Sequence, residues 1–186
     1  MMSGISTPRV KVTSQQTCAI IDHLVDALAY HSSCTIRRAT VLVDIHANPQ
    51  TTQAEILKRL DVSKSALNRD IDWMFNYGAL RRQECPKDAR KIILAVSEYS
   101  AEHLEKALII FKNSHKSLQK FLERFISLLR DEKSTLREAK IIAKIHESGM
   151  ISKQEVLDSL YNGSATTENR ALTKLIEEGF IKDVNT

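Results

Sequence analysis

The sequence predicts a mainly α-helical protein with one small β-hairpin, in which a helical unit of about 45 residues occurs twice. Only 5 glycines and 3 prolines occur among 186 residues, and this scarcity favours helices over an all-strand fold. Apolar residues recur at helical spacing along most of the chain. Residues 37–60 also align with residues 137–160 without a gap, and seven of the 24 positions are identical. The two units are expected to be joined by one long helix.

These patterns divide the chain into four segments. Residues 1–34 are expected to form an N-terminal dimerisation helix, and residues 35–96 the first helical unit with its hairpin. Residues 97–133 are expected to form a long helix with heptad spacing, and residues 134–186 a second unit that lacks the full hairpin.

The first two helices have clear start and stop signals. Thr13 and Gln16 have the spacing of a capping box, in which each side chain bonds the other's backbone at a helix start. The apolar residues that follow predict a helix to about residue 28. A second helix is predicted over 36–47, where Asn48-Pro49 ends it because proline disfavours helical geometry in the residue before it.

The rest of the first unit alternates short helices and strands. Thr52 and Glu55 form a capping box that opens a short helix ending near residue 60. Ser63 caps a longer helix, which Gly78 terminates near Tyr77. Residues 79–84 and 91–96 read as two strands, joined by a polar turn.

The segment 101–131 carries apolar residues in alternating steps of four and three, which is heptad spacing. A single helix of about 30 residues would span about 45 Å, and it cannot bury such a stripe alone. Two explanations are open: a seam between two subunits of a homodimer, or the core helix of one globular domain. The stripe consists of Leu104, Leu108, Phe111, His115, Leu118, Leu122, Phe125 and Leu129.

The second unit repeats the helices of the first. Helices are predicted over 135–148, 152–160 and 165–178, and Ser152 with Glu155 repeats the capping box. Residues 180–184 can form one strand, but the sequence ends at Thr186 and leaves no room for a hairpin.

Several classes of protein are disfavoured. No stretch approaches the roughly 18 apolar residues of a membrane span, and residues 1–12 lack the apolar core of a signal peptide, so a cytoplasmic protein is expected. The three cysteines are far apart and no histidine spacing resembles a zinc site. No catalytic motif is present. We therefore expect no enzyme activity, no cofactor and no metal.

Charge and element order together point to double-stranded DNA. The net charge of +4 is concentrated in residues 35–96, and a local basic excess is typical of polyanion binding. Helix, short helix, turn, longer helix, strand, loop and strand is the order of a winged helix-turn-helix, whose second helix enters the major groove. The candidate DNA-binding residues are Thr52, Ser63, Lys64, Ser65, Asn68, Arg69, Arg82, Lys87, Arg90 and Lys91.

The first unit resembles the MarR family of bacterial regulators. The likeness lies in DVSKSALNRDIDWMFNYGALRR, which resembles that family's recognition helix, and in CPKDARKIILAVSE, which resembles its wing. The resemblance implies that Asp88 orients Arg90, which enters the minor groove. It also implies a homodimer that binds a pseudo-palindromic site, and a small-molecule effector that nothing in the sequence identifies.

The second helix-turn-helix departs from that family's pattern. Its candidate DNA contacts are Ser164, Thr166, Thr167, Asn169, Arg170 and Lys174, although this segment is net acidic and a protein-contact or dimer-packing role is also open. The preferred hypothesis is a dimeric, sequence-specific transcriptional regulator, for example a repressor. The alternatives are a replication or partition factor of a plasmid or phage, and a scaffold that uses tandem winged helices for protein contacts.

Overall fold

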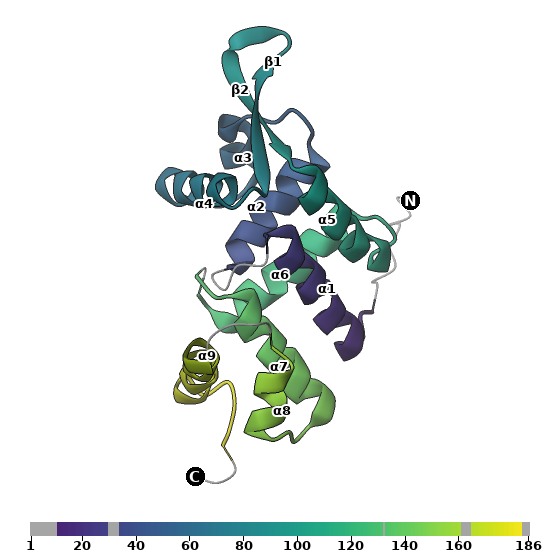
Figure 1. Ribbon diagram of the computed structural model, residues 1–186, viewed down its shortest axis with the longest axis vertical. Coiled ribbons are helices and arrows are strands. Elements are labelled where there is room, and N and C mark those ends of the chain that lie inside the picture. The colour runs from purple at the N-terminus through teal and green to yellow at the C-terminus, as the bar shows by residue number, and fades with distance from the viewer. Residues whose placement is uncertain (1–10, 30–33, 132, 161–164, 184–186) are drawn as a thin grey trace, which may run out of the picture.

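The computed structural model describes residues 11–29, 34–131, 133–160 and 165–183. The molecule is elongated, with the hairpin at one end and α8 and α9 at the other (Figure 1). In the part of the chain so described, no helix combines the length and apolar character needed to cross a membrane. The elements in order are α1 (Ser14–Ala27), α2 (Ile36–Ala47), α3 (Gln53–Arg59), α4 (Lys64–Asn76), β1 (Leu80–Cys85), β2 (Asp88–Val96), α5 (Glu98–Ile110), α6 (His115–Leu129), α7 (Leu136–Ser148), α8 (Lys153–Asp158) and α9 (Ala165–Glu177).

The helices of the first unit begin and end close to the predicted positions. Thr13 caps α1 and Thr52 caps α3, and both form complete capping boxes, with Gln16 and Glu55 respectively. Helix α4 starts after Ser63, whose side chain accepts a hydrogen bond from a backbone N–H of the first turn. These caps satisfy N–H groups that a helix start leaves without partners, so local sequence alone sets the helix starts.

The hairpin β1–β2 forms the predicted wing, but its tip is tighter than expected. Leu80 pairs with Val96 at the base, and Cys85 pairs with Asp88 at the tip after a register shift. The backbone carbonyl of Thr51 accepts a hydrogen bond of 2.9 Å from the N–H of Leu94. This bond fixes the direction in which the wing leaves the helical part.

The prediction of one long helix over 97–133 is wrong, because two helices, α5 and α6, occupy this segment. Lys112 and Asn113 have φ angles of 53° and 61°, a left-handed geometry that ends α5. Asparagine tolerates this geometry better than most residues, and Ser114 then caps α6. Heptad spacing reports which face of a helix is apolar and carries no information on whether the backbone continues.

The apolar stripe of α5 and α6 is buried inside the same chain. Helix α5 packs on α1, and α6 packs on α2. Leu104, Leu118 and Leu122 are fully buried by these contacts, and Leu108 is 3% exposed. The stripe therefore belongs to the core of one folded body, which was the second of the two explanations, and it no longer gives a reason to expect a seam between subunits.

The second unit consists of α7, α8 and α9. Thr135 and Ser152 cap α7 and α8 with complete capping boxes. The strand predicted over 180–184 does not form within residues 180–183, and residue 184 lies outside the described residues. The hairpin of the first unit consequently has no counterpart in the described part of the second.

Candidate nucleic-acid interface

Helix α4 has one buried face and one polar exposed face. Leu67 and Met74 are fully buried and Ile71 is 4% exposed, which is the burial that their spacing of three and four residues gives in a helix. The opposite face is exposed along the first two turns, and it consists of Lys64, Ser65, Asn68 and Arg69. Cationic and amide side chains at the N-terminal end of such a helix are those that reach base edges in the major groove.

A buried ion pair holds α4 against α2. Asp70 is 1% exposed, and its carboxylate accepts hydrogen bonds from Nε of Arg37 at 2.6 Å and from Nε of Arg38 at 3.1 Å. The Arg38 guanidinium also lies over the Trp73 ring, 4.3 Å from its centre. No local sequence pattern predicted this ion pair, because its partners are more than 30 residues apart. The only signal was an acidic residue between the inward positions of α4.

A second buried carboxylate holds α3 in place. Asp44 of α2 is 2% exposed and accepts a hydrogen bond of 2.7 Å from Nη2 of Arg59. The same nitrogen lies 2.7 Å from the hydroxyl oxygen of Thr51. Because the Arg59 guanidinium donates to the Asp44 carboxylate, its pKa is raised above the ordinary value. Both helices of the helix-turn-helix are therefore tied to α2 by charge as well as by apolar packing.

Several predicted contact residues already have partners in the fold. The hydroxyls of Thr52 and Ser63 are engaged in caps. The backbone N–H and hydroxyl of Thr52 bond to Glu55 and lower the pKa of that carboxyl. Oδ1 of Asn68 accepts a hydrogen bond from Nε2 of Gln53 on α3. Ser65 and Arg69 also have partners, because the Ser65 hydroxyl lies 3.3 Å from that of Ser63 and Nε of Arg69 lies 3.4 Å from the Ser65 carbonyl oxygen.

The wing carries exposed cations at its tip. The side chain of Arg90 is 92% exposed, and its Nε lies 3.2 Å from a carboxylate oxygen of Asp88. Lys87 and Lys91 are also exposed. The Asp88–Arg90 contact has the geometry that the family resemblance implies for a wing arginine.

Arg82 lies at the base of the wing rather than at its tip. Its Nη2 forms a 3.0 Å ion pair with Asp72 of α4, and its guanidinium lies over the ring of Phe75, 4.3 Å from the centre. These contacts place Arg82 as a brace between wing and recognition helix.

The predicted contacts of the second unit are partly available. Thr166, Thr167 and Arg170 are exposed, and Asn169 is half-buried. Lys174 is held inside the unit, because its Nζ lies 3.0 Å from Glu138 on α7. Burial lowers the pKa of the Lys174 ammonium, but the hydrogen bond and charge of Glu138, together with the charges of Glu178 and Asp131, outweigh burial and raise it. Ser164 lies outside the described residues.

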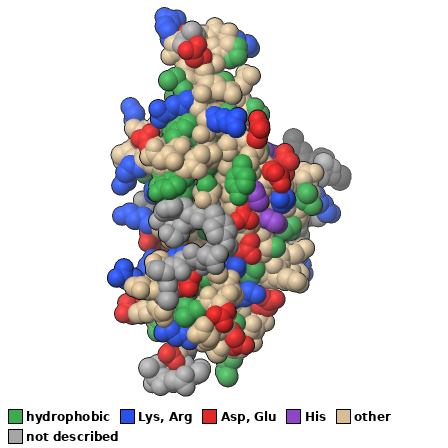
Figure 2. Space-filling model, in the orientation of Figure 1, with side chains coloured by type: hydrophobic (Ala, Val, Ile, Leu, Met, Phe, Trp, Pro, Cys, Tyr) green, Lys and Arg blue, Asp and Glu red, His purple; other side chains and the backbone are tan. Residues whose placement is uncertain are grey.

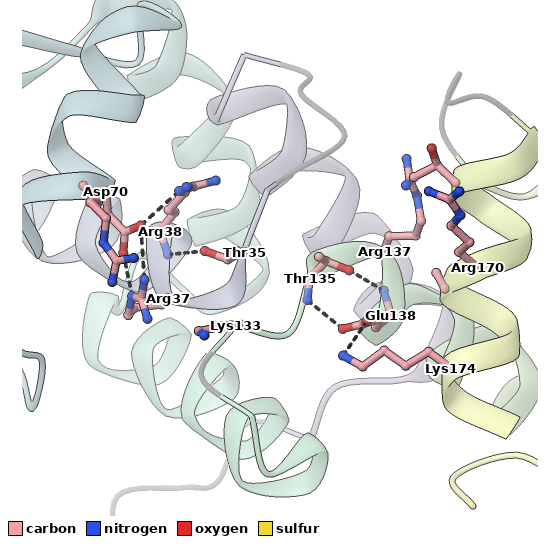
Figure 3. Close-up of a pocket in the computed structure, with 13 residues that line it drawn as sticks. Thr35, Arg37, Arg38, Asp70, Lys133, Thr135, Arg137, Glu138, Arg170 and Lys174 are labelled. Atoms are coloured by element: carbon pink, nitrogen blue, oxygen red, sulfur yellow. Dashed lines mark hydrogen bonds and ion pairs between the residues drawn. The ribbon is translucent and has the colours of Figure 1, made fainter. Parts of the chain in front are cut away.

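A basic pocket of about 530 Å³ lies between the two units (Figure 3). Seven Lys or Arg side chains and only two carboxylates, Asp70 and Glu138, are among its lining residues. In the space-filling view, Lys and Arg side chains follow the edge of the molecule on which α4 and α9 lie (Figure 2). The basic lining is Arg37, Arg38, Arg69, Lys133, Arg137, Arg170 and Lys174.

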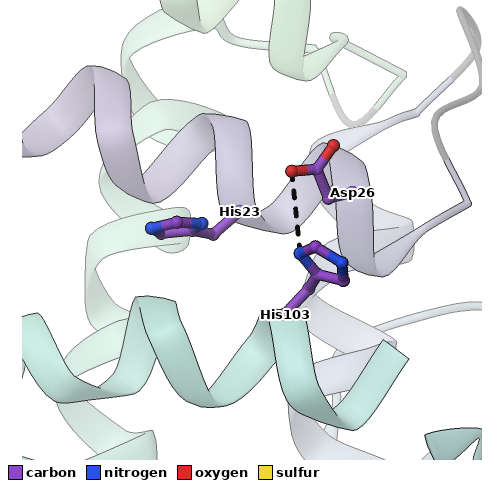
Figure 4. Close-up of side chains that lie close together, drawn as sticks. All are labelled: His23, Asp26 and His103. Atoms are coloured by element: carbon purple, nitrogen blue, oxygen red, sulfur yellow. Dashed lines mark ion pairs between the residues drawn. The ribbon is translucent and has the colours of Figure 1, made fainter. Parts of the chain in front are cut away.

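A separate cluster of metal-binding side chains lies between α1 and α5 (Figure 4). One ligand atom from each of His23, Asp26 and His103 lies within 4.8 Å of the others. No metal site was expected from the sequence, because these ligands come from helices about 80 residues apart.

Comparisons with known proteins identify the first unit. Residues 34–92 match the model of the MarR family. Searches of curated proteins and of solved structures gave no match. The matched segment contains α2, α3, α4 and most of the hairpin, in the order of a winged helix. Residues 34–92 therefore match the MarR family model and have the fold of a winged helix-turn-helix.

Proposed function

We propose that the protein is a sequence-specific regulator of transcription that binds double-stranded DNA through its first unit. A MarR family domain supports a winged-helix transcriptional regulator in general. The observation that carries the more specific proposal is the exposed polar row of α4, which the buried Asp70 carboxylate fixes relative to α2. A rigid and solvent-facing helix is what entry into a groove requires.

The side chains divide by their expected partners. Lys64, Ser65, Asn68 and Arg69 lie on the first two turns of α4, so they face base edges when the helix enters the major groove. Lys87, Arg90 and Lys91 project from the wing and contact the phosphate backbone or the minor groove. The hydroxyls of Thr52 and Ser63 cap the starts of α3 and α4, so we assign these two residues the positioning of both helices on the DNA.

A pseudo-palindromic site is bound by two recognition helices that are related by two-fold symmetry. A homodimer would supply them, as the family resemblance implies, but so would two helix-turn-helix units in one chain. The buried stripe of α5 and α6 removes the reason for a coiled-coil seam. A small-molecule effector remains part of the proposal without an identified chemistry.

Selection of bound fragments from a random duplex pool tests the function directly. We expect an enriched motif, and we expect Arg69→Ala to bind that motif more weakly by about 1–3 kcal/mol in fluorescence anisotropy. Arg124→Ala is the matched control, because Arg124 is an exposed arginine of α6 outside the basic pocket. Equal affinities for Arg69→Ala and the wild type would refute the recognition-helix assignment.

Two further measurements separate the alternatives. A protein-contact scaffold predicts no binding of random duplex even at low salt, whereas a DNA-binding protein shows affinity that falls steeply with salt. A replication or partition factor predicts bound sites in clustered repeats at an origin, whereas a regulator predicts bound sites at promoters.

A further inference from the structure

The internal repeat is longer in the structure than in the sequence alignment. Four consecutive helices correspond: α1 with α6, α2 with α7, α3 with α8, and α4 with α9. Helix α4 begins at Lys64 and α9 at Ala165, and both are 13 residues long. The N-caps also correspond in three cases, as Thr13 and Ser114, Thr35 and Thr135, and Thr52 and Ser152.

The two units also bury the same positions. Each of these residues is 6% exposed or less in the folded chain. The matched pairs are Ala39 with Ala139, Val41 with Ile141, Val43 with Ala143, Ile56 with Val156, Ile71 with Leu172, and Met74 with Leu175. The units are therefore two copies of one packing arrangement.

The contact between the units is reciprocal. Thr35 and Thr135, which are equivalent, form an antiparallel bridge with each other. On each side of the bridge, the N–H of the residue after one threonine donates, over 2.9 Å, to the carbonyl of the residue before the other. The helices are exchanged in the same way, because α1 packs on α7 while α6 packs on α2. Self-complementary contacts of this kind define a two-fold axis.

The basic pocket lies on this pseudo-two-fold axis. Equivalent positions from both units line it, which requires that the axis pass through it: Thr35 with Thr135, Arg37 with Arg137, Arg38 with Glu138, Arg69 with Arg170, and Asp70 with Ala171. Helices α4 and α9 lie on the same side of the molecule, with α4 nearer the hairpin (Figure 1), and residues of both helices line the pocket.

Two of the pocket's arginines point to an anion. Arg137 is 6% exposed, and its buried Nε has no hydrogen-bond partner. Figure 3 shows Arg137 and the exposed Arg170 on the same side of the pocket. Seven cations and two carboxylates line the pocket, so an anion bound there would be stabilised, and phosphate is an anion that arginine binds in bidentate geometry.

We propose that a single chain reads both halves of a DNA site, with α4 in one major groove, α9 in the next, and the basic pocket against the phosphate backbone between them. The proposal rests on the proposed function. In helix-turn-helix dimers the two-fold axis of the protein coincides with that of the DNA site, and the half-sites are one helical turn apart. Here one chain carries the axis, so the groups near it meet the backbone between the half-sites.

The two half-sites are not identical in this arrangement. Asn68-Arg69 recurs as Asn169-Arg170, whereas the position of Lys64 holds Ala165 and that of Leu67 holds Glu168. The described part of the second unit also has no wing. The half-site under α9 is consequently bound with fewer phosphate contacts and reads a partly different sequence.

The stoichiometry on DNA tests this inference. Native mass spectrometry and sedimentation with the selected duplex are expected to show one chain per duplex, with a footprint over two half-sites. Arg170→Ala is expected to weaken binding by about 5- to 150-fold and to reduce the salt dependence by about one phosphate contact. Arg124→Ala is again the control.

The possible outcomes separate the two proposals. Two chains per duplex, or Arg170→Ala binding as tightly as wild type, would overturn the single-chain arrangement while Arg69→Ala still tests the first unit. Absence of any duplex binding at low salt would overturn both. If inorganic phosphate binds the pocket but Arg170→Ala leaves duplex affinity unchanged, the pocket is a small-anion site and the assignment to the DNA backbone is wrong.

Independently of DNA, we infer that His23, Asp26 and His103 bind a divalent cation such as Zn²⁺. Two imidazoles and one carboxylate are a frequent set of protein ligands for zinc, leaving one position for water. Nδ1 of His103 is buried without a hydrogen-bond partner and lies 3.6 Å from Oδ2 of Asp26. Tetrahedral ligands are about 3.3 Å apart for bonds of about 2.0–2.1 Å, so small side-chain movements complete the site.

Calorimetric titration of the full chain with Zn²⁺ tests the metal site. One equivalent is expected to bind and to raise the melting temperature, because the cation joins α1 to α5. His103→Ala and Asp26→Asn should each abolish both effects, whereas His146→Ala, outside the cluster, should retain them. Zinc binding that survives in His103→Ala and Asp26→Asn would contradict the assignment, as would its absence in the wild type.

Discussion

Replacement of Asp70 by alanine tests the buried ion pairs that hold the recognition helix, α4, against α2. The carboxylate is 1% exposed and accepts hydrogen bonds from Nε of Arg37 at 2.6 Å and from Nε of Arg38 at 3.1 Å. Its removal leaves two guanidiniums facing each other with no carboxylate between them. The expected result is a large loss of stability together with weaker DNA binding.

The magnitude follows from burial on the two sides of the pair. Breaking a buried ion pair by removing one partner typically costs about 3–5 kcal/mol. The Arg37 and Arg38 side chains are 13% and 16% exposed and line the open pocket, so they recover part of their hydration after the change. We therefore expect Asp70→Ala to lower the free energy of unfolding by about 2–4 kcal/mol.

Asp72 provides a matched control on the same helix. Its ion pair with Arg82 is 3.0 Å long, but the two side chains are 65% and 55% exposed. Exposed pairs contribute about 0–1 kcal/mol, so Asp72→Ala should change stability little. Urea unfolding followed by far-ultraviolet circular dichroism measures both variants against the wild type. If Asp70→Ala and Asp72→Ala lower the free energy of unfolding equally, burial of the Asp70 ion pairs does not account for the stability of this helix packing.

Two further predictions concern the helices around α6. Leu118 is fully buried, so Leu118→Ala should lower the free energy of unfolding by about 2–5 kcal/mol. Because the apolar stripe is buried within one chain, the melting temperature of the protein should not depend on its concentration. A concentration dependence would indicate a seam between chains. Burial lowers the pKa of both His46 and His115, and His115 lowers that of His46 further against the opposing charge of Glu105. Nδ1 of His46 lies 2.8 Å from Nε2 of His115. Because the unfolded chain binds these protons first, stability present above about pH 6.5 should be lost as the pH falls through the folded-state pKa values. The drop in melting temperature between about pH 7 and 5 should be smaller in His115→Gln, and an unchanged drop would argue against a role of the His46–His115 contact.

Local rules were sufficient for the elements of the first unit. The capping residues Thr13, Thr52 and Ser63 start helices where the sequence predicts them, because a cap bonds only N–H groups within three residues. The inward positions Leu67, Ile71 and Met74 follow from helical periodicity alone. The recognition helix and its exposed row were therefore predictable without tertiary information.

The same local rules failed for residues 97–133. Heptad spacing is satisfied equally by one long helix and by two helices that present the same face, and Lys112 and Asn113 decide between them. Sequence periodicity also cannot say which surface covers an apolar stripe. That surface proved to be α1 and α2 of the same chain.

The amino-acid sequence was enough to predict the helix starts, the wing and the basic charge of the first unit, because caps, periodicity and charge are properties of neighbouring residues. The folded chain was needed to show that Thr35 bridges to Thr135, and that distant side chains meet at Asp70, at the basic pocket and at His103. Contacts between residues 30 to 130 positions apart depend on how packed helices are oriented, and no local pattern encodes that orientation.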